Sequence, residues 1–251
     1  MAQQRLDKII ASTGRYSRRE VKTLVREGRV LVDGRIAASA EDKCDPLTAR
    51  ISVNGEELFY REHTYVMLHK PAGVLSATED GRGETVLDLL APEYRKIGLF
   101  PVGRLDKDTE GLLLLTDDGA LAHDLLAPKK HVDNVYVVRA VGALAVADCK
   151  AFEQGITLGD GLECLPAKLE ILKSDAQSEA LITIHEGKFH QIKRMLASRG
   201  KPVVYLKRLS MGSLTLDEGL SKGEYRLLTA EEIKNLRESG QFAQGKAGAD
   251  K

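Results

Sequence analysis

The sequence predicts an α+β fold, with a small N-terminal domain followed by a larger domain built on a mostly antiparallel mixed sheet flanked by helices. Strand and helix patterns are mixed along the chain without the strict alternation of a doubly wound fold. Four leucines at 112–115, bounded by turn residues, are typical of a strand buried on both faces. The pattern changes after Asn54 and Gly55, so we expect domains at 1–60 and 61–238, with a disordered tail at 239–251.

Each element has a local signal. Ser17 and Glu20 have the spacing of a capping box, and apolar residues recur behind them at helical intervals. Gly28 ends that helix, and the next strand enters an Asp33-Gly34 hairpin turn. In the larger domain we expect strands at 65–70, 112–115, 135–141, 167–173, 180–185, 203–209, 213–216 and 224–228. Helices are expected at 85–90, where Pro92 ends the helix, at 120–126 and 144–154, after residues 187–191, and after Thr229.

Composition excludes several classes of protein. The 37 basic and 37 acidic side chains cancel, so net charge indicates no partner. Cys44, Cys149 and Cys164 form no C-x-x-C pair, which argues against disulfides or a zinc knuckle and favours a reducing cytoplasm. His185 and His190 are a weak alternative for a metal site, and we expect none. The sequence has neither an apolar N-terminal core nor a long apolar stretch, so we expect no signal peptide and no membrane contact.

Positive charge is nevertheless unevenly distributed. Residues 5–35 contain nine basic and four acidic side chains, and no acidic residue occurs between residues 187 and 216. Lys129 and Lys130 add a third basic cluster. Such concentration favours a phosphate-bearing partner, and the scarcity of aromatics favours folded RNA over broad stacking on a single strand. The alternative is that acids from elsewhere in the fold balance these charges. The N-terminal candidates for RNA contact are Arg5, Lys8, Arg15, Arg18, Arg19, Lys22 and Arg26.

One carboxylate stands out as a candidate for chemistry. Asp106 lies in a charged, glycine-bounded loop just before the leucine run, where a rigid strand fixes its position. Nucleotide-binding glycine motifs and the G-x-S-x-G elbow are absent from the sequence. Asp106 needs a cationic neighbour to stay ionised, and Lys193 or Arg194 could supply it. Adjacent helical residues point about 100° apart, so we expect only one of these two residues to face Asp106. The alternative is that the loop containing Asp106 is only a solvated turn without a chemical role.

Five segments together resemble a known family. They are RLDKIIASTGRYSRREVKTLVREGRVLVDG at 5–34, HKPAGV at 69–74, GRLDKDTEGLLLLTDDG at 103–119, VYVV at 135–138 and EGKFHQIKRM at 186–195. With them the chain resembles the ribosomal RNA pseudouridine synthases of the RsuA family, which carry an N-terminal alpha-L RNA-binding domain. The resemblance covers residues 5–236 and implies an isomerase that converts uridine to pseudouridine.

The resemblance implies roles for single residues. Asp106 falls on the catalytic aspartate that attacks the uridine and lets the glycosidic bond break. Tyr136 falls on the tyrosine that stacks on the uracil and helps remove the proton from carbon 5. Lys193 falls on the basic partner of the aspartate. Arg104 matches the residue that fills the gap left by the flipped base. The plainer alternatives are that Arg104 is a solvated loop arginine and Tyr136 an ordinary strand aromatic.

The remaining matches concern binding. Ile192 falls on the apolar residue beneath the base. We group Lys70 and Arg194 with the substrate-binding set, although the role of the first motif, which contains Lys70, looks structural. The family often has a lysine two residues before the tyrosine, and here that position is Asn134. This departure affects the expected RNA specificity more than the chemistry.

The implied reaction needs a flipped base but no cofactor or metal, because it only rearranges atoms. A covalent carboxylate adduct divides one hard step into easier ones, and its position on sugar or base stays open. The expected partner is 16S rRNA in an assembling small subunit, because the resemblance is closest to that subgroup at 162–171 and in the third motif. The alternatives are a 23S rRNA uridine and a non-catalytic RNA-binding assembly factor. A monomer is the default expectation.

Overall fold

The four leucines at 112–115 lie in strand β9 (Glu110–Thr116), and every residue of this strand is buried. Such a run without polar alternation is stable where both faces of a sheet are covered. β9 pairs in antiparallel register with β7 (Tyr65–Lys70), which is buried at every position, and in parallel register with β15 (Val203–Met211). The predicted core strand and the mixed character of the sheet are therefore confirmed.

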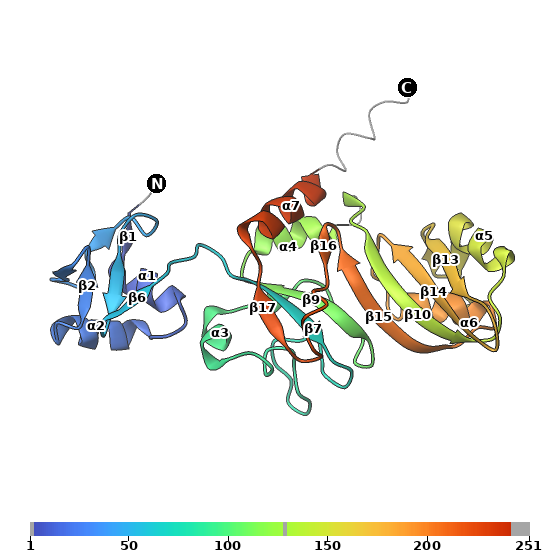
Figure 1. Ribbon diagram of the computed structural model, residues 1–251, viewed down its shortest axis with the longest axis horizontal. Coiled ribbons are helices and arrows are strands. Elements are labelled where there is room, and N and C mark those ends of the chain that lie inside the picture. Colours follow the sequence, from blue (N-terminus) through green and yellow to red (C-terminus); the bar gives the residue numbers. More distant parts are fainter. Residues whose placement is uncertain (1–2, 128–129, 242–251) are drawn as a thin grey trace, which may run out of the picture. The chain divides into compact units, whose positions relative to one another are not determined.

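The structure is a computed structural model that describes residues 3–127 and 130–241 (Figure 1). The chain forms two compact units. The first extends to Thr64 and includes Leu90–Leu99, and the second comprises Tyr65–Leu89 and the chain from Phe100 onward. The sequence placed the boundary at residue 60 and did not anticipate that Leu90–Leu99 belongs with the first unit.

The first unit contains β1 (Gln4–Arg5), α1 (Leu6–Ser12), α2 (Arg18–Arg26), β2 (Val30–Val32), β3 (Arg35–Ile36), β4 (Lys43–Cys44), β5 (Ile51–Val53), β6 (Glu56–Leu58) and α3 (Pro92–Ile97). The predicted capping box opens α2, because Glu20 N donates to Ser17 Oγ at 3.3 Å and Ser17 N donates to Glu20 Oε2 at 2.6 Å. Asp33 and Gly34 both have positive φ, as a two-residue hairpin turn between β2 and β3 requires. Apolar faces of both helices pack with the strands into one core.

The second unit adds β8 (Phe100–Pro101), α4 (Gly119–Leu126), β10 (Asn134–Val141), α5 (Val146–Gln154), β11 (Ile156–Thr157), β12 (Glu163–Cys164), β13 (Lys168–Lys173), β14 (Gln177–Ile184), α6 (Gln191–Ser198), β16 (Leu214–Thr215), β17 (Tyr225–Leu227) and α7 (Ala230–Gln241). Its nine-stranded sheet runs β13-β14-β10-β15-β9-β7-β17, with β16 beside β15 and β8 beside β9. Only the β15–β9 pair is parallel among the described strands. The α+β prediction is thus confirmed.

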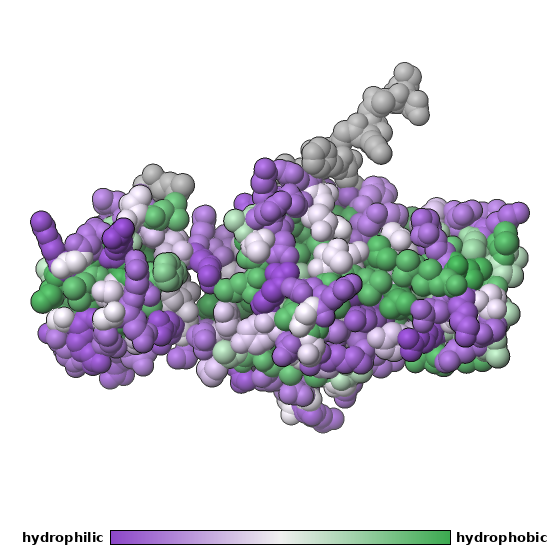
Figure 2. All heavy atoms as spheres, in the orientation of Figure 1, coloured by the Kyte–Doolittle hydropathy of each residue, from purple (hydrophilic) through white to green (hydrophobic). Residues whose placement is uncertain are grey.

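The two faces of β10 differ in burial. Tyr136, Val138 and Ala140 alternate along the buried face, whereas Val135 and Val137 are only half-buried. Figure 2 shows a band of hydrophobic residues over this half of the sheet. Helix α6 packs against β15, next to β10. The buried face of β10 therefore directs Tyr136 into the interior of this unit.

Some local predictions were wrong. Residues 85–90 form a turn instead of a helix, in which Thr85 donates from both N and Oγ1 to Asp88 Oδ2 at 2.9 Å. Pro92 starts helix α3 instead of ending a helix, because the first helical position needs no backbone N–H. Helix α7 continues to Gln241, into the predicted tail, and residues 242–251 lie outside the described chain. Within the described ranges, the helices are too short or too polar to span a membrane.

Candidate active site

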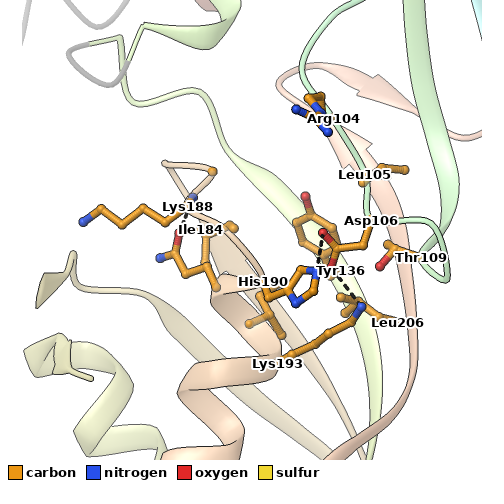
Figure 3. A pocket seen from close by; sticks show the side chains of 13 residues that line it. Arg104, Leu105, Asp106, Thr109, Tyr136, Ile184, Lys188, His190, Lys193 and Leu206 are labelled. Atoms are coloured by element: carbon orange, nitrogen blue, oxygen red, sulfur yellow. Dashed lines mark hydrogen bonds and ion pairs between the residues drawn. The ribbon is translucent and has the colours of Figure 1, made fainter. Parts of the chain in front are cut away.

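Asp106 lies in the loop between β8 and β9, and its carboxylate is paired with an ammonium from α6 (Figure 3). Lys193 Nζ is 2.8 Å from Asp106 Oδ2 and 2.5 Å from Asp108 Oδ1. The side chains of Asp106 and Lys193 are 25% and 21% exposed, whereas that of Asp108 is 75% exposed. The loop therefore presents two acids to a single cation, and the less exposed acid lies in the pocket.

The two carboxylates determine the charge of Lys193. Burial alone would lower the pKa of this ammonium, but its hydrogen bonds to Asp106 and Asp108 outweigh burial and raise the pKa above its ordinary value. The bond from Lys193 also lowers the pKa of Asp108. Because both directions favour the charged forms, Lys193 and Asp108 stay ionised near neutral pH, and Asp106 faces a fixed positive charge.

Lys70 anchors the backbone of the loop that contains Asp106. Its side chain is fully buried, and Nζ donates to the carbonyl oxygens of Pro71, Asp106, Lys107 and Thr109 at 2.9, 3.2, 3.3 and 2.9 Å. Burial lowers the pKa of Lys70 to about 8, although nearby carboxylates act in the opposite direction. A residue with no exposed surface that binds only loop backbone is a positioning residue. The grouping of Lys70 with substrate contacts is therefore corrected.

Buried apolar and aromatic side chains complete the pocket around Asp106. Among them are Tyr136 on β10, Ile192 on α6 and Leu206 on β15. The cavity volume of the pocket is about 60 Å³, which makes it a small and partly open site. The structure thus brings together Asp106, Tyr136, Ile192 and Lys193, four residues that we expected to form one site.

The side chains of the two arginines predicted to bind substrate, Arg104 and Arg194, lie in different places. Arg104 is exposed and lines the same pocket from the loop (Figure 3). Arg194 points elsewhere, because its Nη2 lies 2.6 Å from Asp160 Oδ2. Helix geometry separates Arg194 from Lys193 by about 100°, which explains why only Lys193 reaches Asp106. Arg194 is not among the residues that line the pocket.

Sequence reasoning missed His190 as a site residue. Its ring lines the pocket, and Nε2 lies 3.6 Å from Asp106 Oδ1. His190 lies immediately before helix α6 in a left-handed backbone conformation, so helical spacing does not relate its side chain to that of Lys193. The sequence therefore carried no clear signal for this residue. Asp108, two residues after Asp106, was likewise not recognised as a second partner of Lys193.

The basic clusters are only partly free of acids. Arg5 pairs with Asp7 and Glu41, Arg15 with Glu56, and Lys22 with Glu41. Of the seven predicted RNA contacts in the first unit, four are exposed and have no acidic partner within the described part of the chain: Lys8, Arg18, Arg19 and Arg26. These four form the exposed basic surface.

Acids balance much of the second basic stretch. Lys188 pairs with Glu186, two residues before it, and Arg199 pairs with the distant Asp148 at 3.0 Å. Lys130 lies 3.7 Å from Asp124, while Lys129 lies outside the described residues. For these residues the alternative of balancing acids holds. Among the described side chains, no group of three or more His, Cys, Asp or Glu has the arrangement of a metal site.

Comparison with known proteins agrees with this fold. The family model described as RNA pseudouridylate synthase matches residues 64–198, and the model of the S4 domain matches residues 4–46. The chain belongs to the RNA pseudouridylate synthase family. It is an isomerase that modifies RNA, with an S4 RNA-binding domain at its N-terminus.

Several relatives are similar over nearly their whole length. An uncharacterized RNA pseudouridine synthase of Bacillus subtilis, YtzG, is 50% identical over 93% of this chain and 98% of its own. Ribosomal small subunit pseudouridine synthase A of Vibrio cholerae is 40% identical, covering 92% of this chain and 99% of its own. Ribosomal large subunit pseudouridine synthase B of Bacillus subtilis is 39% identical, with 93% and 96% covered. A solved pseudouridylate synthase is 37% identical, with a TM-score of 0.65 over 93% of this chain and 99% of its own.

Proposed function

We propose that this enzyme isomerises a specific uridine of ribosomal RNA to pseudouridine, with Asp106 as the reacting carboxylate. The observation that carries the proposal is the pairing of Asp106 with Lys193 at 2.8 Å, inside a pocket that Tyr136 also lines. A carboxylate paired with an ammonium beside an apolar and aromatic pocket is suited to react with an uncharged pyrimidine. A protein that only bound RNA would have no need of an acid that repels phosphate.

In the proposed reaction, the uridine leaves the RNA stack and enters the pocket, which costs a few kcal/mol. Asp106 forms a bond to the nucleotide and the bond between N1 and the ribose breaks. The uracil turns, carbon 5 bonds to the ribose and the bond between Asp106 and the nucleotide breaks, which restores the free carboxylate. The proton of carbon 5 is lost while N1 gains one. The atoms balance without a co-reactant. Tyr136 and Ile192 supply surfaces that hold the base, and Arg104 fills its place in the RNA.

For the target, we propose 16S rRNA of an assembling small subunit, modified by a monomer in the cytoplasm. The small-subunit relative from Vibrio cholerae supports this choice, together with the resemblance at 162–171. The large-subunit relative is nearly as similar, at 39% against 40% identity, and makes a 23S rRNA uridine the second candidate. The exposed residues Lys8, Arg18, Arg19 and Arg26, together with Arg194, are the proposed phosphate contacts.

Asp106→Asn tests the chemistry. The substitution keeps the size and hydrogen-bonding shape of the side chain but removes the reacting oxygen anion. We expect RNA affinity in filter binding to be retained and pseudouridine formation to fall by at least about 10³-fold. The assay is the release of tritium from carbon 5 of labelled uridine in rRNA transcripts.

Asp108→Asn is the matched variant, because it removes the other carboxylate that binds Lys193. An equal loss in the two variants would contradict the assignment, since it would make charge balance at Lys193 the only role of Asp106. Mapping pseudouridines in 16S and 23S rRNA from cells with and without the gene identifies the target. A site that disappears from 23S rRNA alone would replace the first candidate with the second.

A further inference from the structure

A large aromatic side chain is exposed beside the pocket. Phe189, just before helix α6, is 75% exposed. Burying a phenylalanine is strongly favourable, so a ring this open at the edge of an active site is a candidate for contact with a ligand. The only equally exposed large hydrophobic side chain among the described residues is Phe59, which belongs to the other unit.

The Phe189 ring is held in a defined orientation. It stacks on His190, with ring centroids 3.9 Å apart and planes inclined by 17°. His190 has a φ of 49°, in the left-handed region that non-glycine residues rarely occupy. Strained backbone of this kind concentrates at functional sites. The unusual conformation places the imidazole in the pocket, with Nε2 3.6 Å from Asp106 Oδ1, while Phe189 stays outside.

Phe189 lines a groove that is continuous with the pocket. The groove has a cavity volume of about 520 Å³ and shares Arg104, Asp106 and His190 with the pocket. Arg104 and Lys107 on its wall are exposed and have no acidic partner within the described ranges. An aromatic face beside unpaired cations is the combination that binds a nucleic-acid strand, through base stacking and phosphate attraction.

We propose that Phe189 is the stacking platform for the nucleobase adjacent to the extruded uridine. This inference rests on the proposed function, since it needs an RNA strand that enters the groove beside Asp106. The His190 ring supports the platform from the pocket side. Stacking tolerates any base, so the platform senses whether a base is present more than which base it is. The enzyme would therefore require a neighbouring base on one side of its target.

The test is a double-mutant cycle between the ring and the base. The probe is a synthetic fragment of the rRNA around the uridine that the wild-type enzyme modifies, made intact and with an abasic nucleotide on either side of that uridine. The variants are Phe189→Leu, Phe189→Tyr and, as a matched control, Phe59→Leu. The loss of one stacked base corresponds to roughly a 5- to 150-fold fall in kcat/KM. We expect this loss in Phe189→Leu on intact RNA and retained activity in Phe189→Tyr.

On one of the two abasic fragments, Phe189→Leu and wild type should be equally slow, because the partner of the ring is already missing. Equal activity of Phe189→Leu and wild type on intact RNA would overturn the platform. The platform would also be overturned if Phe189→Leu were slower than wild type by the same factor on both abasic fragments as on intact RNA. That result would assign Phe189 a structural role through His190. Failure of the wild-type enzyme to modify any rRNA would instead overturn the proposed function, and the platform with it.

Discussion

Replacing Lys70 with methionine tests how the reactive loop is held. The methionine side chain has nearly the same length, so the buried space stays filled while all four hydrogen bonds to loop carbonyls are lost. The oxygens of Asp106 and Lys107 also accept bonds from the backbone N–H groups of Thr109 and Gly73. The two 2.9 Å bonds, to the carbonyls of Pro71 and Thr109, are therefore expected to carry most of the effect.

The expected loss of stability is small, because two large contributions oppose each other. Two hydrogen bonds from a charged donor contribute about 3–6 kcal/mol. Removing the buried ammonium returns about 3 kcal/mol, because its pKa is lowered from 10.5 to about 8 and each pKa unit corresponds to about 1.4 kcal/mol. The net cost is about 0–3 kcal/mol, which corresponds to a fall in Tm of roughly 0–10 °C.

Lys70→Met is expected to reduce activity strongly, even where the loss of stability is small. Without its anchor, the loop carrying Asp106 shifts, and a displacement of about 1 Å at a reacting group costs roughly 10²-fold. The assay is tritium release from rRNA at a temperature where the variant is fully folded, judged by circular dichroism. Lys173→Met, which removes an exposed lysine paired with Asp175, is the control. Wild-type kcat in a folded Lys70→Met enzyme would refute the anchoring role.

Two further predictions concern stability. Gly111→Ala is expected to destabilise the protein by at least about 2 kcal/mol, because Gly111 has a φ of 106° and an added Cβ would lie 2.2 Å from the carbonyl oxygen of Arg208. An unchanged midpoint in urea would contradict this expectation. In the second, the unfolding free energy of wild type relative to Lys70→Met rises between pH 8 and 10.5 by about 3 kcal/mol. The unfolded chain still binds this proton in that window and the folded chain does not, and parallel pH curves for the two proteins would disprove the effect.

Local sequence signals predicted the parts of the structure that depend on neighbours in the chain. The capping box at Ser17 and the hairpin turn at Asp33 each need only a few adjacent residues, and both are present. The run of four leucines predicted a buried strand because no polar residue interrupts it. A proline in the sequence is ambiguous, because it ends a helix when it falls in the interior but is favoured at the first position of a new helix. That ambiguity led to the wrong reading of Pro92.

Features that depend on distant contacts were beyond local reasoning. The four bonds of Lys70 go to backbone oxygens, which every residue carries, so no side-chain pattern marks them. The partners of Arg194 and Arg199, Asp160 and Asp148, lie far away in sequence, and charge counting over one stretch overlooked them. The left-handed backbone of His190 is also a product of tertiary structure, because histidine has no intrinsic preference strong enough to reveal it.

The sharing of Lys193 by two acids has a consequence for the reaction cycle. In the adduct we propose, Asp106 becomes an ester and loses its negative charge, whereas the ammonium beside it keeps its positive charge. An isolated cation in a partly buried site is costly by several kcal/mol. Asp108, 2.5 Å from the same ammonium, remains as its counter-ion when Asp106 is esterified. The solvent-facing acid thereby leaves the Lys193 ammonium with a counter-ion before, during and after covalent bonding to RNA.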